Sequence, residues 1–370
     1  MKKFLLIFLA LLTVACIAAM PFLCSHSNIL PEVSTAYYEY KAKEEALTAT
    51  GPDAELMRML TGLTPDTKLE PVRTPLSFSR FGMALAAGTV LSLVWLRYAC
   101  AKQPELRLAL MWTIVLVVPI SLIGARLVYC LVNISFYLSA ISAPAAMLKP
   151  WEGGLSLAGA LAAAALTGLI GAKLGKVPAA RVLDAMAYPL LLMAAYADMA
   201  VGYISMGFGP EVSGLGSLLT IDINGAGRLD TTVVVLLVLL ALLLAIHLIL
   251  RRRSIPAGHR FALTAFLYGS VMILMESLRE DGHMVWGFVH AEMVFDLCFA
   301  LPALLYLAKT KKRILLALLA TAVLAGAVVA LEFALDRSSI GDGLLYTAYI
   351  AVLGGYIFFG CTCAEKRLAV

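Results

Sequence analysis

Charged residues are scarce in this chain of 370 residues. Only 14% of the residues are charged and 61% are hydrophobic, whereas a soluble domain averages about 25% charged residues. This balance excludes an ordinary soluble domain and predicts an all-α, polytopic bundle of transmembrane helices. The net charge of +5 does not indicate a nucleic-acid partner, because in a membrane protein the placement of Lys and Arg relative to the spans matters more than their sum.

Cysteine patterns that would support a metal site or a disulfide framework are also lacking. The seven cysteines are scattered along the chain, and most lie in apolar runs. No spacing among them resembles a zinc site, so we interpret them as small buried apolar residues. We expect neither a metal nor another cofactor.

Long apolar runs are abundant, and about ten of them are suited to span a membrane. They cover Phe4–Leu23, Leu76–Trp95, Leu108–Val132, Leu155–Leu174, Val182–Met206, Thr231–Leu250, Phe261–Leu278, Met293–Leu307, Ile314–Leu335 and Leu344–Phe359. Basic residues gather at every second connection, in Arg97–Arg107, Lys176–Arg181, Arg251–Arg253, Lys309–Arg313 and Lys366–Arg367. By the positive-inside rule these connections and both termini are cytoplasmic, so we expect the functional face to be external.

The chain divides into four parts. Residues 1–24 form a signal anchor or a cleaved signal peptide, and we favour the uncleaved anchor. Thr13-Val14-Ala15-Cys16 is similar to a lipobox, but Leu is preferred three residues before the cysteine, and apolar residues continue after Cys16. Residues 25–75 are a polar external segment, 76–309 form the membrane core, and 310–370 supply two additional helices.

A stripe of polar side chains crosses one of the apolar runs. Arg126, Tyr129, Asn133 and Tyr137 follow one another at i, i+3, i+7 and i+11, and these offsets share one face of a helix. Because polar groups in hydrocarbon are costly, the stripe should face the bundle interior or a water-filled cavity. A short connection then leads to Trp151-Glu152-Gly153-Gly154-Leu155-Ser156.

Ionisable residues also lie within or at the ends of other apolar runs. At a lipid-facing helix centre each would cost roughly 2.5–3.5 kcal/mol, so we expect them to be inward-facing and partnered. Asp198 lies near the middle of its run and is expected to pair with Arg126 or Arg279. The structural alternative is an ion-pair network that holds helices together. The set comprises Arg126, Asp184, Asp198, Glu276, Arg279, Glu292, Asp296 and Glu332.

Two helical faces should carry four of these eight residues. Tyr268, Met272, Glu276 and Arg279 share a face of one predicted helix, and Glu292 and Asp296 share a face of the next. A different pattern, in which small residues recur every four positions, predicts close helix packing. It comprises Gly159, Ala163, Thr167 and Gly171.

The order of these motifs resembles that of the bacterial prolipoprotein diacylglyceryl transferases. The similar features are Arg80-Phe81-Gly82, then Gly124-Ala125-Arg126 with its polar stripe, then Trp151-x-Gly153-Gly154-Leu155-Ser156, and finally Tyr268-Gly269 with Glu276 and Arg279. The resemblance covers roughly residues 76–309, and it implies a seven-helix core in the bacterial cytoplasmic membrane.

The resemblance also implies a reaction and its partners. Members of the family transfer the diacylglyceryl group of phosphatidylglycerol, an anionic phospholipid, to the lipobox cysteine of precursor proteins. Arg126 and Arg279 would hold the headgroup phosphate, and Glu276 would orient Arg279. Candidate proton acceptors are His290, Glu292 and Asp198. The pocket would be lined by Tyr129, Asn133, Tyr137, Trp151, Gly153, Gly154 and Ser156.

Several positions depart from the family pattern. The family has His-Gly-Gly after its Leu-Ser-Phe, where this chain has Ala158-Gly159-Ala160. Asp198 aligns with an essential arginine of the family, Met272 replaces a second arginine, and Glu292 stands where glutamine is usual.

These departures keep three functions open. The chain is a divergent lipid transferase, a non-catalytic relative that binds lipid or lipoprotein precursors, or a proton-coupled carrier. A headgroup-sized cavity near Arg126 and Arg279 with a base in reach would favour the transferase. If apolar side chains filled that space, the transferase function would be excluded. The sequence shows no pair of helices interrupted by Gly or Pro in corresponding halves of the chain, which is the pattern typical of a carrier.

Overall fold

The computed structural model describes residues 2–22, 79–138, 154–204, 206–212, 218–223, 225–281, 285–338 and 341–368, and six isolated positions. Of the segments singled out from the sequence, most of the external segment 25–75 and the positions of Trp151 and Gly153 lie outside these residues.

Ten helices of 17 residues or more make up the described chain, as expected from the apolar runs. They are α1 (Lys2–Ala19), α4 (Arg80–Lys102), α5 (Arg107–Val132), α7 (Leu157–Gly175), α8 (Ala179–Gly202), α9 (Thr231–Leu250), α10 (His259–Ser277), α11 (Ala291–Leu307), α12 (Lys311–Arg337) and α13 (Asp342–Leu368). One short helix, α6 (Ile134–Tyr137), follows α5. Seven of the ten are long and apolar enough to cross a membrane: α4, α5, α7, α8, α9, α12 and α13.

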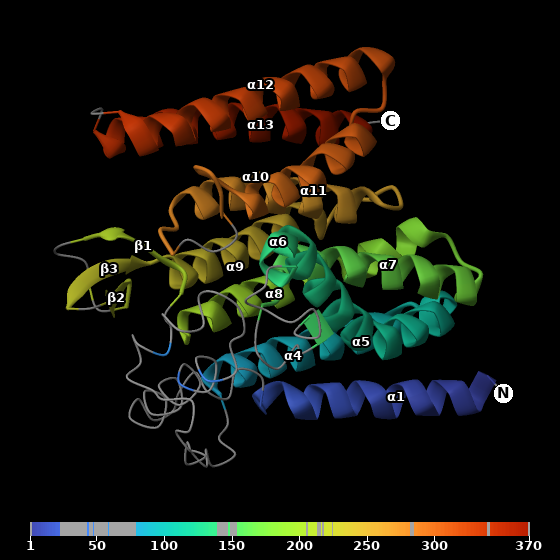
Figure 1. Cartoon of the computed structure of the whole chain (residues 1–370). Coiled ribbons are helices and arrows are strands. Elements are labelled where there is room, and N and C mark those ends of the chain that lie inside the picture. The colour runs from blue at the N-terminus through green and yellow to red at the C-terminus, as the bar shows by residue number, and fades with distance from the viewer. Residues whose placement is uncertain are drawn as a thin grey trace.

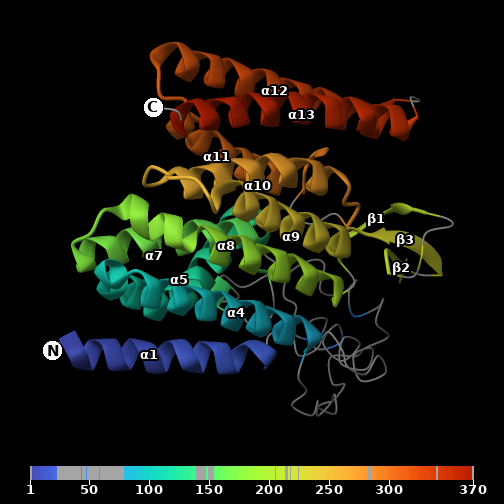
Figure 2. The ribbon, with the colours of Figure 1, turned by 180° about the vertical axis from the view of Figure 1, so that it is seen from behind.

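The helices lie side by side in one bundle (Figure 1, Figure 2). The resemblance implied a core of seven helices within residues 76–309, and these are α4, α5, α7, α8, α9, α10 and α11. Helix α1 is at one edge, and the α12–α13 hairpin is at the opposite edge. Both termini lie at the same end of the bundle. The basic connections after α4, α7, α9 and α11 lie at this end as well, which agrees with the alternation seen in the sequence.

A small sheet stands at the other end of the bundle, and it was not predicted. Strands β1 (Phe208–Glu211), β2 (Thr220–Ile223) and β3 (Ala226–Asp230) pair antiparallel in the order β1-β3-β2. Strands β4 (Val285–Trp286) and β5 (Val289–His290) form a separate hairpin. Strands of two to five residues are too short to show a clear alternation of apolar and polar side chains, so the sequence interpretation treated both segments as connections.

Small residues bring α5 and α7 into close contact, as their spacing predicted. A Cβ atom on Gly159 would lie 2.8 Å from Val128 Cβ, and one on Gly171 would lie 2.7 Å from the carbonyl oxygen of Ala109. Any side chain at these two positions would therefore separate the helices. The close approach fixes the start of α7, which carries Ser156, against α5.

Candidate functional site

A cavity of about 280 Å³ lies among α4, α5, α7, α8, α10 and α11. Most of its wall is apolar, with side chains that include Leu85, Leu93, Val117, Leu122, Leu161 and Leu190. Met20, which follows α1, completes the wall on one side. A wall of this kind suits hydrocarbon chains, because pockets for apolar ligands are lined in the same way.

One part of the cavity is polar and mainly acidic. Among the described residues that line it, five carboxylates accompany a single guanidinium: Asp198, Glu276, Asp281, Glu292 and Asp296 beside Arg279. Three helices contribute to this cluster, since Asp198 is on α8, Glu276 on α10, and Glu292 and Asp296 on α11. The two faces predicted for α10 and α11 therefore meet across one space.

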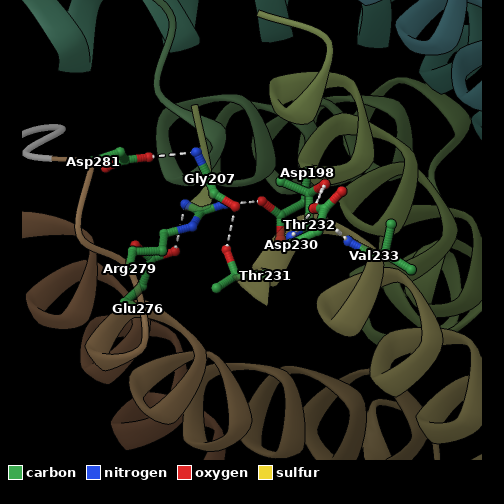
Figure 3. Close-up of polar contacts among 9 residues, drawn as sticks. All are labelled: Asp198, Gly207, Asp230, Thr231, Thr232, Val233, Glu276, Arg279 and Asp281. Atoms are coloured by element: carbon green, nitrogen blue, oxygen red, sulfur yellow. Dashed lines mark hydrogen bonds and ion pairs between the residues drawn. The ribbon is translucent and has the colours of Figure 1, made fainter. Parts of the chain in front are cut away.

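Arg279 is the centre of the acidic cluster. Its Nη2 forms an ion pair with Asp198 Oδ1, and its Nη1 lies 2.9 Å from Glu276 Oε1 (Figure 3). The structure thus pairs Asp198 with Arg279. From the sequence alone, Arg126 was the alternative partner. One expectation was wrong in detail, because α10 ends at Ser277 and Arg279 enters the cavity from the following turn. Its backbone N–H donates to the Glu276 carbonyl oxygen at 3.2 Å.

Ser156 links α7 to α11. Its hydroxyl donates to Glu292 Oε1 at 3.1 Å and accepts the backbone N–H of Gly159 at 3.2 Å. The same oxygen is therefore the N-cap of α7 and a partner of a buried carboxylate. Since Ser156 and Glu292 both line the cavity, this contact places the Glu292 carboxylate on the cavity wall.

The predicted single helix of the polar stripe was wrong, because α5 ends at Val132 and Tyr137 lies on the short α6. Among the described residues of the stripe, one reaches the cavity wall. Tyr129 lines the cavity together with Gly154. Arg126 donates from Nε to the Met147 carbonyl oxygen and from Nη1 to the Gly154 carbonyl oxygen, both at 3.0 Å. Its guanidinium also lies 5.6 Å from the centre of the Tyr137 ring. Arg126 thus contacts the backbone of two described positions before α7, Met147 and Gly154, and its role as a phosphate ligand stays a prediction.

Asn133 ends α5. Its side-chain Nδ2 donates to the Tyr129 carbonyl oxygen at 3.0 Å, and it is the C-cap residue of the helix. Among the described residues, the Asn133 side chain therefore contacts the backbone of its own helix. Its contact with substrate stays a prediction.

A turn at Gly207 connects the acidic cluster to the small sheet. The Gly207 N–H donates to Asp281 Oδ2 at 2.7 Å, and its carbonyl oxygen accepts the Thr231 hydroxyl at 2.6 Å (Figure 3). Gly207 has φ of +70°, which favours glycine. Asp281 was missed as a site residue, because it follows an apolar run and nothing in its local pattern distinguishes it from a loop carboxylate.

His290, one of the proposed proton acceptors, is not among the described residues that line the cavity. It is the N-cap residue of α11. Burial lowers the pKa of its imidazole below the ordinary value, which favours the neutral form. Asp198 and Glu292, the two other candidates, do line the cavity.

Fold and site together define a multi-pass membrane protein with an apolar cavity that ends in a cluster of charged residues. A family model for prolipoprotein diacylglyceryl transferase matches residues 71–309, well over half of the chain. The chain therefore belongs to the prolipoprotein diacylglyceryl transferase family.

Relatives named phosphatidylglycerol–prolipoprotein diacylglyceryl transferase show the same likeness. The protein of Symbiobacterium thermophilum is 27% identical over 246 residues, which are 65% of this chain and 91% of the relative. That of Listeria monocytogenes serotype 4b is 26% identical over 241 residues, or 62% of this chain and 85% of the relative. Helices α1, α12 and α13 lie outside the segment that the family model matches.

Proposed function

We propose that the protein transfers a diacylglyceryl group from a glycerophospholipid to the lipobox cysteine of a precursor protein. One observation carries this proposal. The cavity joins an apolar wall to a charged end, and that end is built from two segments that resemble family motifs, Gly154–Ser156 and Glu276–Arg279. The apolar wall would hold the acyl chains, and the charged end would hold the reacting groups. The names of the relatives supply phosphatidylglycerol and prolipoprotein as the substrates to test first.

The reaction requires one proton transfer and one substitution. The cysteine thiol gives up its proton to a carboxylate, and its sulfur bonds to the glycerol carbon that carries the phosphate. The C–O bond to the phosphate breaks, and the headgroup phosphate, which is glycerol phosphate when phosphatidylglycerol is the donor, leaves with the electron pair of that bond. Glu292 is our candidate for the proton acceptor, because it faces the cavity and makes a single described hydrogen bond with Ser156. Asp198 and Glu276 would hold Arg279 toward the phosphate.

The placement of charge supports an orientation in the bacterial cytoplasmic membrane. Basic residues lie at the end that holds both termini, and the positive-inside rule would make that end cytoplasmic. The polar part of the cavity is close to the opposite end, since Glu280, the residue after Arg279, donates its N–H to the Phe208 carbonyl oxygen of β1 at 2.9 Å. A lipid from the outer leaflet and a translocated precursor would both reach that end.

A second candidate function is lipid binding without transfer. It is favoured by the two carboxylates on Arg279, because they already compensate the charge that would otherwise attract a phosphate. A protein of this kind would hold a lipid or a lipobox segment, or assist an active transferase.

Complementation separates the two candidates. Cells depleted of their own prolipoprotein diacylglyceryl transferase would express this chain, and survival and the gel mobility of a model lipoprotein would be followed. We expect lipidation with the wild type and with Arg337→Ala, an exposed site at the end of α12. Lipidation should be lost with Glu292→Gln. No lipidation from wild-type protein that is present in the membrane would contradict the transferase proposal and favour the non-catalytic relative.

A further inference from the structure

Helix α1 has the sequence pattern of a signal segment. Lys2 and Lys3 precede its apolar run, and a small residue, Ala15, precedes Cys16 near the end of that run. Secretory signal segments have the same order, with a basic start, an apolar run of about 7–15 residues and small residues at its end. The lipobox precursors of the proposed reaction carry such a segment. Helix α1 therefore has the chemistry of the acceptor that the chain is proposed to modify.

A proline in α5 creates a contact point for a neighbouring helix. Pro119 lies inside α5 and has no N–H, so the Val115 carbonyl oxygen lacks the donor four residues later. The Thr13 hydroxyl of α1 donates to this oxygen at 2.7 Å. The same hydroxyl lies 3.0 Å from the Leu9 carbonyl oxygen of its own helix, which is the longer contact. Within a membrane, a carbonyl freed by proline needs a donor of this kind, because no water is present to replace it.

Few side chains attach α1 to the bundle. Among the described side chains of α1 and of the turn η1 that follows it (Met20–Phe22), Thr13 and Met20 are buried, at 5% and 4% exposed, and the others are partly buried or exposed. Helix α10, in contrast, buries most of its side chains. Removal of α1 from the bundle would therefore uncover less apolar surface than removal of a core helix.

The surface under α1 borders the cavity. Met20 lines the cavity together with Thr89 of α4 and Val118 of α5, and the Thr89 hydroxyl lies 3.6 Å from Met20 Sδ. Val118 follows Val115 at i+3, so the contact with Thr13 and the cavity wall lie on neighbouring parts of α5. A helix in the place of α1 would bring the residue after its apolar run to the cavity, at the position of Met20.

We propose that residues 115–122 of α5 form the docking surface for the signal helix of a lipobox precursor, and that α1 occupies this surface until a precursor displaces it. The lipobox cysteine then takes the position of Met20 at the cavity. Small residues at the end of a signal segment, serine among them, can donate to the Val115 carbonyl oxygen as Thr13 does. Helix α1 is thus an inhibitory helix. This inference rests on the proposed function, because it concerns the acceptor that reaches the same cavity.

Photocrosslinking tests the docking surface without requiring transfer. The probe is a synthetic precursor segment with two lysines, a lipobox and a photoreactive residue in its apolar run. It would be bound to the full chain in vesicles, and the crosslinked peptides would be mapped by mass spectrometry. We expect crosslinks within residues 115–122. Thr13→Val should raise their yield about fivefold, the ratio that corresponds to one hydrogen bond of ordinary strength.

Thr321→Val is the matched control and should leave the yield unchanged. Thr321 is also 5% exposed, and it lies on α12 at the edge of the bundle opposite α1. Crosslinks confined to other helices would overturn the inference. An unchanged or lower yield with Thr13→Val, in a variant that remains monomeric in detergent, would also overturn it, because α1 would then be a fixed part of the wall.

A peptide competitor keeps the test decisive if Thr13→Val does not fold. A synthetic peptide of residues 1–24 should reduce crosslinking of the precursor to the wild-type chain. The same peptide with Thr13→Val should require an about fivefold higher concentration for the same reduction. Absence of competition, or equal competition by the two peptides, would show that the Val115 carbonyl oxygen does not recognise the helix and would overturn the inference.

Activity distinguishes failure of this inference from failure of the proposed function. The same samples would be assayed for the thioether product in vesicles that contain phosphatidylglycerol. Crosslinks within residues 115–122 without product would support the docking surface and contradict the transferase proposal. Product from a precursor that crosslinks only to other helices would overturn the docking surface and leave the transferase proposal standing.

Discussion

Arg279 is the residue on which the polar end of the cavity depends most. It is buried between Asp198 and Glu276, and it is the single guanidinium among the described residues of the wall. Such an arrangement is sensitive to the loss of one partner, because the remaining charges stay buried without compensation. The same arrangement explains how several carboxylates are accommodated in an apolar bundle.

Arg279→Gln should therefore destabilise the protein by about 3–5 kcal/mol. The double variant with Asp198→Asn should recover part of that loss, because it also removes one of the carboxylates left without compensation. Thermal unfolding in detergent, read as loss of soluble monomer, measures both. Equal stability of the Arg279→Gln variant and the wild type would mean that the ion pairs shown here do not form.

Ser156 offers a test that separates helix capping from function. Ser79 and Ser156 both cap a helix by accepting the N–H three residues later, on α4 and α7. The Ser156 hydroxyl in addition donates to a cavity carboxylate, Glu292. Replacement of either by alanine should cost a similar amount of stability, about 0.5–2 kcal/mol.

Lipidation in the complementation assay should fall much more for Ser156→Ala than for Ser79→Ala. An equal loss of activity in the two variants would show that the hydroxyl of Ser156 acts only as a cap.

At the scale of elements, helices outside the family segment complete the site. The α12–α13 hairpin contacts the end of α10, where the Ser277 hydroxyl donates to Glu332 Oε1 at 2.6 Å. Tyr346 of α13 donates to the Ser277 carbonyl oxygen at 3.0 Å. Ser277 directly follows Glu276, so the hairpin supports the turn that carries Arg279.

A double-mutant cycle measures this support. Ser277→Ala and Glu332→Gln should each destabilise the protein, and the double variant should lose less than the sum of the two. The difference should be about 0.5–3 kcal/mol, the usual range for residues in direct contact. Additive losses in thermal unfolding would show that the hairpin and the end of α10 are independent.

Helix α1 should be retained in the mature protein. Its Thr13 hydroxyl donates to the Val115 carbonyl oxygen of α5 at 2.7 Å, and the carbonyl oxygen of Pro21 accepts the N–H of Ser79 at 2.8 Å. Met20 closes part of the cavity wall. Because cleavage would expose this wall to lipid, we expect the intact mass of the purified protein to include residues 1–24. A mass that begins near residue 25 would contradict this role of α1.

At the scale of the whole molecule, patterns that repeat along a whole helix were predictable from the sequence. Short strands and contacts between segments far apart in the chain were not. Apolar runs and small residues every four positions predicted ten helices and the close contact of α5 with α7. The helical faces that carry Glu276 and Glu292 were also predictable, whereas the position of Arg279 beyond the end of α10 was not. The strands around residues 208–230 were too short to show a period. Asp281 and Met20 join the cavity through tertiary contacts that local sequence does not encode.

The central claim is that this cavity carries out diacylglyceryl transfer, and a reconstituted reaction tests it most directly. Purified protein in vesicles containing phosphatidylglycerol and phosphatidylethanolamine would be given a lipobox peptide, and the thioether product would be detected by mass spectrometry. We predict product from the wild type and from Arg337→Ala, and none from a Glu292→Gln variant that is as stable as the wild type. Absence of product from the wild type, in vesicles where a relative such as the Listeria monocytogenes enzyme forms it, would contradict the account.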